Sequence, residues 1–328
     1  MIKLAVDCMG SDNGPLAICE GIKNFLNNNQ DVFIYACGDE KELSSLNDNE
    51  RVKIVHTTEV VPMECGAMQV MRMKNSSMMK AISLFNDEHV DAAVSAGSTG
   101  GFLSLATLKL KLIPGIERAA LISPFPTKTG KPVAILDIGA SNENTPSQLV
   151  QFAAMGKIYS QAIFNNELPR VYLLSNGTEE KKGSPVGKEA YQLLKVSNFD
   201  GFCGNIEARE ALSGVADVIV SEGYTGNVFL KSTEGVAKMM SDMIKGAFKR
   251  TFFSKIGYLF ARKGFKEMSE KMNYKNFGGA MLLGVNGVVV KAHGNSDAYS
   301  FEKALDLALR MANTDIVNKI KEGINNGL

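Results

Sequence analysis

Short apolar segments alternate with helical segments along this chain, and Gly-rich polar turns join one to the next. The clearest unit spans residues 90–112, where an apolar run at 92–94 is followed by the turn SAGSTGG and then by a helical pattern of apolar side chains. The N–H groups of a first helical turn are free, and the helix dipole favours an anion beside them. The turn is therefore a candidate anion site, although a simple N-cap without a ligand uses the same residue types.

The same construction recurs through the sequence and constrains the fold class. Further strands are predicted at residues 2–6, 32–36, 52–55, 119–122, 133–136, 170–174, 215–220 and 287–291, and helices at 15–26, 76–85, 146–161, from about 185, after 227 and at the C-terminal end. This alternation is typical of an α/β fold with a largely parallel sheet covered on both faces. Ligands bind at the carboxyl ends of strands in such sheets. At least six predicted strand ends carry Gly, Asn, Ser, Thr or Asp, and because they could face one crevice they predict a binding site of some kind.

The overall charge and hydropathy exclude several classes of protein. A net charge of +1 gives no support for general nucleic-acid binding. No apolar run is long enough to cross a membrane, and the N-terminus lacks a basic-then-apolar leader, which predicts a cytoplasmic protein. The five cysteines are widely spaced and are expected to be small buried hydrophobes of a reducing compartment rather than disulfides, zinc ligands or nucleophiles. They are Cys8, Cys19, Cys37, Cys65 and Cys203.

One segment, at about 245–275, departs from the average composition. It holds nine Lys or Arg against two acids, interleaved with Phe, Tyr, Ile and Leu. A basic amphipathic helical segment of this kind is typical of a surface for an anionic membrane or an acidic partner protein. A helical hairpin that packs on its own subunit or on a dimer partner would have the same pattern, and the sequence leaves both open.

The common catalytic signatures are missing from the sequence. It has no Walker A motif, no G-x-S-x-G and no H-E-x-x-H, and MGSDNGP stands where a dinucleotide fingerprint would follow the first strand. No spacing indicates a metal site, so neither a metal nor a cofactor is predicted. Of the three histidines, only His293 falls in a Gly-rich loop at a predicted strand end, and it is the one candidate for a site.

Taken together, the loop sequences closely resemble the phosphate acyltransferases of bacterial phospholipid synthesis (PlsX). The segments that carry the resemblance are AVDCMGSDNGP, SAGSTGG, LDIGASNENTPSQLVQFAAMGKIYS, NGTEEKKG, FCGNIEARE, SGVADVIVSEGYTGNVFLKSTEG and GGAMLLGVNGVVVKAHGNSDA, in family order from residue 2 to about 310. The resemblance implies one unit over residues 1–328, with a three-layer α/β/α fold and a mixed, mostly parallel sheet like that of phosphotransacetylase and isopropylmalate dehydrogenase.

The resemblance also implies an activity and its partners. Family members move a fatty acyl chain from acyl carrier protein to inorganic phosphate, and the acyl phosphate feeds a membrane glycerol-3-phosphate acyltransferase. A homodimer in the cytoplasm, peripherally associated with the inner face of the membrane, is expected. The missing motifs fit this reaction, because phosphate is itself an anionic nucleophile and a thiolate is a good leaving group. The protein needs only to position phosphate and to supply donors to the oxyanion, without a covalent acyl-enzyme.

The resemblance assigns roles to particular residues. Lys182 would supply charge to phosphate or the oxyanion, Asn227 would donate to phosphate or the carbonyl, and His293 would complete the catalytic set. The expected substrate-binding residues are Asp7, Asn13, Ser98, Thr99, Gly100, Asn142, Asn205 and Thr225. The expected docking residues for carrier protein or membrane are Lys249, Arg250, Phe252, Phe253, Lys255, Arg262 and Lys263. Ser11 and Ser98 stand where many relatives carry Gly and Asn, so residue 98 would contact phosphate through a hydroxyl.

Three other functions remain as alternatives. A nicotinamide-dependent hydroxyacid dehydrogenase shares the expected fold but usually needs clustered aspartates for a metal, which the sequence lacks. A phosphotransacetylase acting on coenzyme A thioesters is chemically closer. A non-catalytic anion-binding membrane scaffold would use the same polar loops without turnover.

Overall fold

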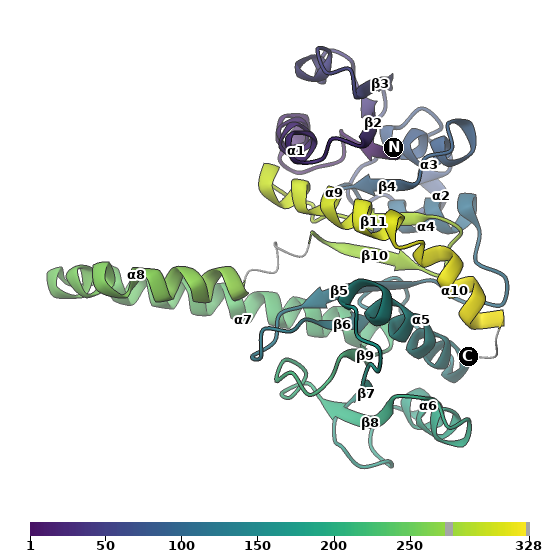
Figure 1. The fold of residues 1–328 in the computed structure, drawn as a ribbon, viewed down its shortest axis with the longest axis vertical. Coiled ribbons are helices and arrows are strands. Elements are labelled where there is room, and N and C mark those ends of the chain that lie inside the picture. Colours follow the sequence, from purple (N-terminus) through teal and green to yellow (C-terminus); the bar gives the residue numbers. More distant parts are fainter. Residues whose placement is uncertain (273–277, 326–328) are drawn as a thin grey trace.

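The computed structural model describes residues 1–272 and 278–325, and within these ranges eleven strands form one sheet (Figure 1). The strands are β1 (Ile2–Asp7), β2 (Val32–Gly38), β3 (Val52–His56), β4 (Ala92–Ser95), β5 (Ala120–Phe125), β6 (Val133–Leu136), β7 (Val171–Ser175), β8 (Phe202–Glu207), β9 (Val218–Val220), β10 (Ala280–Leu283) and β11 (Val288–Lys291). Their spatial order is β3-β2-β1-β4-β11-β10-β5-β6-β9-β7-β8. β8 and β10 were not predicted as strands from the sequence.

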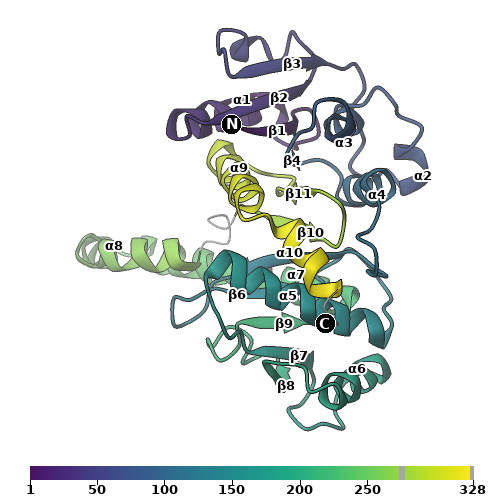
Figure 2. The same cartoon turned by 45° about the vertical axis from the view of Figure 1, so that its right-hand side comes forward.

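The helices cover both faces of the sheet. They are α1 (Gly14–Asn28), α2 (Ala67–Val70), α3 (Ser77–Asp87), α4 (Thr99–Leu110), α5 (Pro146–Phe164), α6 (Pro185–Val196), α7 (Gly223–Lys249), α8 (Phe252–Met272), α9 (Ala298–Asn313) and α10 (Ile316–Asn325), with a short 3-10 turn at Ser44–Leu46. α1, α5 and α9 pack on one face, whereas α3 and α4 pack on the other (Figures 1 and 2). The three-layer α/β/α class with a mixed, mostly parallel sheet is confirmed.

The alternation of side chains along each strand produces two cores. In β4, Ala92 and Val94 belong to the core under α1 and α9, and Ala93 between them belongs to the core under α3 and α4. All three are fully buried, which explains why the segment is a continuous apolar run rather than an alternating one. Local signals set the helix starts: α5, for example, begins with a capping box between Thr145 and Gln148.

The two parallel blocks of the sheet run in opposite directions. β1, β2, β3, β4 and β11 are mutually parallel, and so are β6, β9, β7 and β8. Between the blocks, β10 is antiparallel to β11 and to β5, and β5 is antiparallel to β6, so the direction reverses three times. The carboxyl ends of the two blocks therefore do not share an edge of the sheet.

Helix α7 connects the second block to the first. It begins after β9, and a helix that follows a strand runs back along that strand, so α7 travels toward the edge where β4 and β11 end. It then continues past the body and forms a hairpin with α8, which projects from the molecule (Figure 1). We call residues 235–272 the arm.

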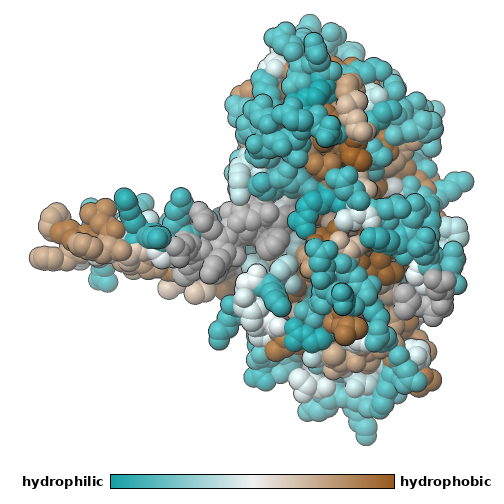
Figure 3. Space-filling view, viewed as in Figure 1, coloured by the Kyte–Doolittle hydropathy of each residue, from teal (hydrophilic) through white to brown (hydrophobic). Residues whose placement is uncertain are grey.

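The arm contains the basic segment predicted at about 245–275, of which residues 273–275 lie outside the described residues. The rings of Phe248, Tyr258 and Phe265 pack together inside it, with centroids 4.8 Å apart for Phe248 and Phe265. All seven predicted docking residues are exposed, and apolar side chains gather at the free end of the arm (Figure 3). In the part of the chain that the structure describes, no helix has the length and hydropathy needed to span a membrane.

Four of the five cysteines are buried as predicted, but Cys203 is exposed. It lies in β8, the last strand of the sheet, where no neighbour covers one side. The expectation of a buried small hydrophobe was wrong for this residue, because the sequence did not reveal that its segment is an edge strand.

Candidate active site

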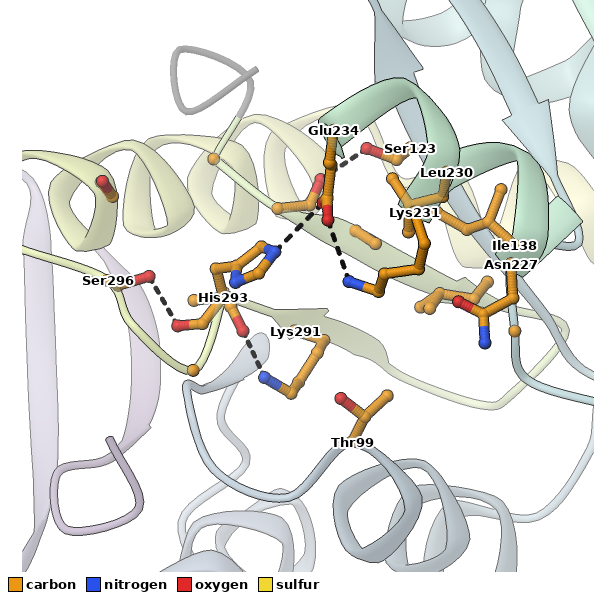
Figure 4. A pocket seen from close by; sticks show the side chains of 18 of the residues that line it. Thr99, Ser123, Ile138, Asn227, Leu230, Lys231, Glu234, Lys291, His293 and Ser296 are labelled. Atoms are coloured by element: carbon orange, nitrogen blue, oxygen red, sulfur yellow. Dashed lines mark hydrogen bonds and ion pairs between the residues drawn. The ribbon is translucent and has the colours of Figure 1, made fainter. Parts of the chain in front are cut away.

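A cavity of about 370 Å³ opens on the face of the sheet that α4 and α7 cover (Figure 4). Its walls come from the start of α4, the end of β5, the loop after β6, one face of α7 and the loop that follows β11. The loops after β4 and β11 come from one sheet block, and the loop after β6 and the start of α7 come from the other, so both blocks contribute to the lining. We call this cavity the pocket.

One face of α7 supplies three polar side chains to the pocket. Asn227, Lys231 and Glu234 are spaced by four and three residues, which places them above one another on a helix. Figure 4 shows them in this order along α7, with Leu230 beside Lys231. The row starts beside Gly139, where a Cβ would lie 3.3 Å from the Asn227 side chain and where φ is +130°, so the close approach requires glycine.

Lys291, the last residue of β11, places a buried ammonium group in the pocket. The residue is 7% exposed, and its Nζ donates to the carbonyl oxygen of Ala292. Burial lowers its pKa to about 8, whereas the carboxylates of Asp7 and Asp12 act to raise it. The group is therefore mostly charged at neutral pH. Within the described ranges it forms no salt bridge, which leaves its charge available to an anion.

Glu234 joins two other pocket residues. Its Oε2 lies 3.0 Å from Nζ of Lys231, and its Oε1 lies 3.1 Å from Nε2 of His293 (Figure 4). Partial burial raises the pKa of Glu234, but the hydrogen bonds with His293 and Lys231 outweigh that effect and leave the pKa below its ordinary value. The carboxylate is thus charged at neutral pH and holds α7 against the loop after β11.

The N-terminus of α4 points its backbone donors at the same pocket. Ser98 is the N-cap, and its Oγ accepts a hydrogen bond of 3.2 Å from the N–H of Gly101. The next two residues, Thr99 and Gly100, line the pocket, and their N–H groups have no acceptor inside the helix. These donors, the helix dipole and Lys291 together form an environment for an anion.

An apolar wall borders this polar region. Leu121, Phe125, Ile138, Leu230 and Ala280 line the pocket beside the residues from α4 and β11. The pocket therefore has an anion-binding side and a side suited to an aliphatic group, which is the pattern of a site for an amphipathic ligand.

Buried carboxylates hold the loops of the pocket in place. Asp7 accepts hydrogen bonds of 2.6 Å from the hydroxyls of Ser77 and Ser95, beneath the start of α4. Asp137 accepts from the N–H groups of Gly139 and Ser141 and so shapes the loop after β6. Both carboxylates are almost completely buried and act on the backbone rather than on the cavity.

The structure brings part of the predicted site together. Asn227, His293, Thr99 and Gly100 line the pocket. Ser98 is 2% exposed and serves as a helix cap instead of lining the cavity. Two other predicted residues support the pocket without lining it. Asp7 accepts the hydrogen bonds beneath the start of α4, and Asn13 donates from Nδ2 to the carbonyl oxygens of Asn295 and Ser296.

Four further predicted residues lie outside the lining of the pocket, and their roles stay predictions. Lys182 is exposed in the loop between β7 and α6, with its stem against Gly177. Asn205 donates from Nδ2 to the carbonyl oxygen of Glu179 and so braces that loop. The other two, Asn142 and Thr225, are exposed. The loop that carries Lys182 is tied to the start of α7, because the Ser184 hydroxyl donates to Glu222.

Sequence reasoning missed three pocket residues, Lys231, Glu234 and Lys291. A signal existed for each of them. Lys291 ends a predicted strand whose other side chains are apolar, and a lysine in such a buried strand indicates a binding or catalytic role. Lys231 and Glu234 lie four and seven residues after Asn227, which is the spacing of one helix face.

Comparisons with known proteins decide the family. The model of the family described as "Fatty acid synthesis protein" matches residues 2–319. A phosphate acyltransferase of Clostridium perfringens is 41% identical, over 98% of this chain and 97% of the relative. One from Streptococcus uberis is 39% identical, over 99% and 98%. The chain belongs to the phosphate acyltransferase (PlsX) family. It is therefore an enzyme of the transferase class, and the predicted family is confirmed.

Solved structures agree with the fold of this chain. A phosphotransacetylase from Streptococcus pyogenes matches with a TM-score of 0.62 and 16% identity, covering 97% of this chain and 94% of the other. A branched-chain phosphotransacylase from Enterococcus faecalis matches with a TM-score of 0.58 and 16% identity, over 94% and 99%. A likeness at this identity concerns the fold alone, and it is the fold that the sequence predicted.

Proposed function

We propose that this enzyme transfers a long-chain fatty acyl group from acyl carrier protein to inorganic phosphate, without a covalent acyl-enzyme. The observation that carries the proposal is the pairing, in one pocket, of a buried lysine and a helix N-terminus with an apolar wall. The first two suit phosphate, and the wall suits the thioester arm of an acylated carrier. The lining residues, all of them described, include no cysteine to act as a nucleophile.

In the proposed mechanism, phosphate binds between Lys291 and the N–H groups of Thr99 and Gly100. One phosphate oxygen attacks the thioester carbonyl carbon and forms the new C–O bond. Asn227 donates to the developing oxyanion, which then collapses as the C–S bond breaks and the thiolate of the carrier leaves. His293 supplies a proton to that thiolate. Positioning and charge stabilisation carry the rate, and no strong base is needed.

Lys182 enters the proposal as a second cation for phosphate or the oxyanion, on the strength of the family resemblance. Its loop is braced on both sides, through Asn205 and through the contact of Ser184 with Glu222. That contact lies at the start of the helix that carries Asn227. A movement of this loop toward the pocket would bring a charged side chain to the side where Asn227 lies.

The arm is the proposed docking surface, and its chemistry suits an acidic carrier protein and an anionic membrane. Lys255, Arg262 and Lys263 supply charge, while Phe252 and Phe253 are 72% and 82% exposed. We place the enzyme in the cytoplasm, at the inner face of the membrane, where a glycerol-3-phosphate acyltransferase would consume its product. A homodimer is proposed from the exposed apolar stripe along α7, formed by Val228, Val236, Met239, Met240 and Met243.

The test is phosphate-dependent release of carrier thiol from palmitoyl-acyl carrier protein, with palmitoyl-coenzyme A assayed beside it. Lys182→Ala and Asn227→Ala are measured in the same assay, with circular dichroism as the control for folding. Turnover that requires phosphate, yields acyl phosphate and is lost in both folded variants is the expected result. Turnover with only the coenzyme A ester would move the enzyme to a phosphotransacetylase-like activity. Thiol release from neither donor would leave a phosphate-binding scaffold.

A further inference from the structure

Glu234 places a negative charge in a pocket that is proposed to bind phosphate. A carboxylate near an anion site weakens anion binding by repulsion, so its presence there needs an explanation. Its two oxygens contact two different cation-capable groups, Lys231 at 3.0 Å and His293 at 3.1 Å (Figure 4). Each of the two groups contacts a different oxygen of the carboxylate.

We propose that Glu234 is a positioning residue for acyl transfer, which orients His293 and Lys231 and in exchange lowers the affinity for phosphate. This inference rests on the proposed function. The carboxylate connects α7, which comes from one sheet block, to the loop after β11, which comes from the other. It therefore fixes the relative placement of groups that no local sequence contact holds together.

The geometry explains why a carboxylate serves this purpose. Lys231 has a long flexible side chain that is 59% exposed, and the His293 side chain is 40% exposed. Without Glu234, Lys231 would sample several rotamers and His293 would lose one of its contacts, and ordering these groups at the moment of reaction would add to the barrier. Glu234 is itself only 18% exposed in its side chain, so its own orientation is set by packing. An ordered anchor thus restrains two mobile groups.

The exposure of Lys231 and His293 also makes a positioning role of Glu234 distinguishable from a structural role. Both side chains are exposed, and ion pairs with solvent-exposed partners contribute little to folding, on the order of 0–1 kcal/mol. Removing the Glu234 carboxylate should therefore leave the stability of the enzyme nearly unchanged. A loss of turnover in a variant of unchanged melting temperature points to lost orientation rather than to a disturbed fold.

The experiment compares Glu234→Gln and Glu234→Asp with the wild-type enzyme. Glu189→Gln, at an exposed position of α6 outside the pocket, is the matched control. Phosphate is varied at saturating palmitoyl-acyl carrier protein to separate kcat from KM, and phosphate binding to the enzyme without thioester is measured by calorimetry. Melting temperatures are recorded for every protein.

The expected result is a split between turnover and binding. Glu234→Gln should lower kcat by at least about tenfold, because a neutral amide no longer holds Lys231. The same variant should bind phosphate several times more tightly, because a repelling charge is gone. Glu234→Asp, which keeps the charge one methylene further away, should recover part of kcat. The control should match the wild-type enzyme.

Two results would overturn the proposal. One is a Glu234→Gln enzyme with wild-type kcat and wild-type phosphate affinity. The other is a parallel loss of kcat, phosphate binding and melting temperature, which would make Glu234 a structural residue. Failure of the proposed function is distinguishable from both. If the wild-type enzyme binds phosphate but releases no thiol, the reaction is wrong, and the calorimetry alone decides whether Glu234 lowers the affinity for phosphate: tighter binding in Glu234→Gln supports this, and unchanged binding refutes it.

Discussion

Lys291 and the lysines of the arm carry the same ammonium group in opposite surroundings. Lys291 is 7% exposed at the end of a strand, and burial lowers its pKa to about 8. Lys249, Lys255 and Lys263 are exposed on helices that project from the body. A desolvated charge acts strongly on one ligand at short range, whereas solvated charges act weakly and together over a broad surface. The difference separates a site for a small anion from a surface for a large one.

Helix α7 belongs to both regions. Its first three turns carry Asn227, Lys231 and Glu234 into the pocket, and its remainder forms half of the arm. The structure thus separates the chemistry from the docking along one continuous helix. Substitutions at the two ends should change different measurements, which is the basis of the predictions below.

The largest effect is expected at Lys291. Lys291→Met keeps the aliphatic stem but removes the charge, so phosphate loses its buried partner, and kcat/KM for phosphate should fall by at least about 100-fold. Lys255→Met on the arm is the control and should stay within about twofold of wild type in kcat/KM for phosphate, in an assay without membranes and at saturating palmitoyl-acyl carrier protein. Equal kcat/KM values for phosphate in the two variants, with unchanged melting temperatures, would contradict this role of Lys291.

The next largest effect is expected for the two exposed phenylalanines at the bend of the arm. A Phe252→Ser, Phe253→Ser double variant should lose at least about tenfold in partitioning to vesicles rich in phosphatidylglycerol, because each ring contributes about 1.5–3 kcal/mol when buried. Cosedimentation measures the partitioning. Leu193→Ser, which changes an exposed apolar residue of α6, is the matched control. Wild-type vesicle binding by the double variant would exclude the arm tip as the membrane contact.

The sequence predicted more of the arm and the fold than of the pocket. The basic aromatic segment and the buried strand at 92–94 follow from local pattern, because composition and periodicity determine exposure and burial. The reversal between the sheet blocks depends on how β10 and β5 pair with distant strands, and no local signal encodes that pairing. For this reason His293 could be named as a candidate, whereas its contact with Glu234 of α7 could not. The position of Lys182 outside the pocket could not be predicted either, because its loop follows β7, which runs opposite to β4 and β11.

A smaller effect is expected from pH, and it sharpens the contrast between buried and exposed lysines. Because the pKa of Lys291 in the free enzyme is about 8, the charge is present below that pH and lost above it. Phosphate affinity should therefore weaken as pH rises, by about eightfold between roughly pH 7.5 and 9 if the charged form is required. Calorimetry at several pH values measures the change. Lys291→Arg should flatten the profile, because a guanidinium stays charged throughout this range. A wild-type profile that is already flat would remove Lys291 from the phosphate site.

The smallest effect on turnover is expected from a change inside the arm. Phe248 packs against Tyr258 and Phe265, with centroids 5.4 Å and 4.8 Å away. Such aromatic pairs contribute about 0.5–1.5 kcal/mol each beyond their buried area. Phe248→Ala should therefore loosen the hairpin and speed limited proteolysis within the arm, while turnover of palmitoyl-coenzyme A, if it is a substrate, changes by less than about twofold. Phe260→Ala is the control, since that ring is 87% exposed and its loss should leave the proteolysis pattern unchanged. A large loss of turnover in Phe248→Ala would mean that the order of the arm reaches the pocket through α7, and the two regions would then act as one.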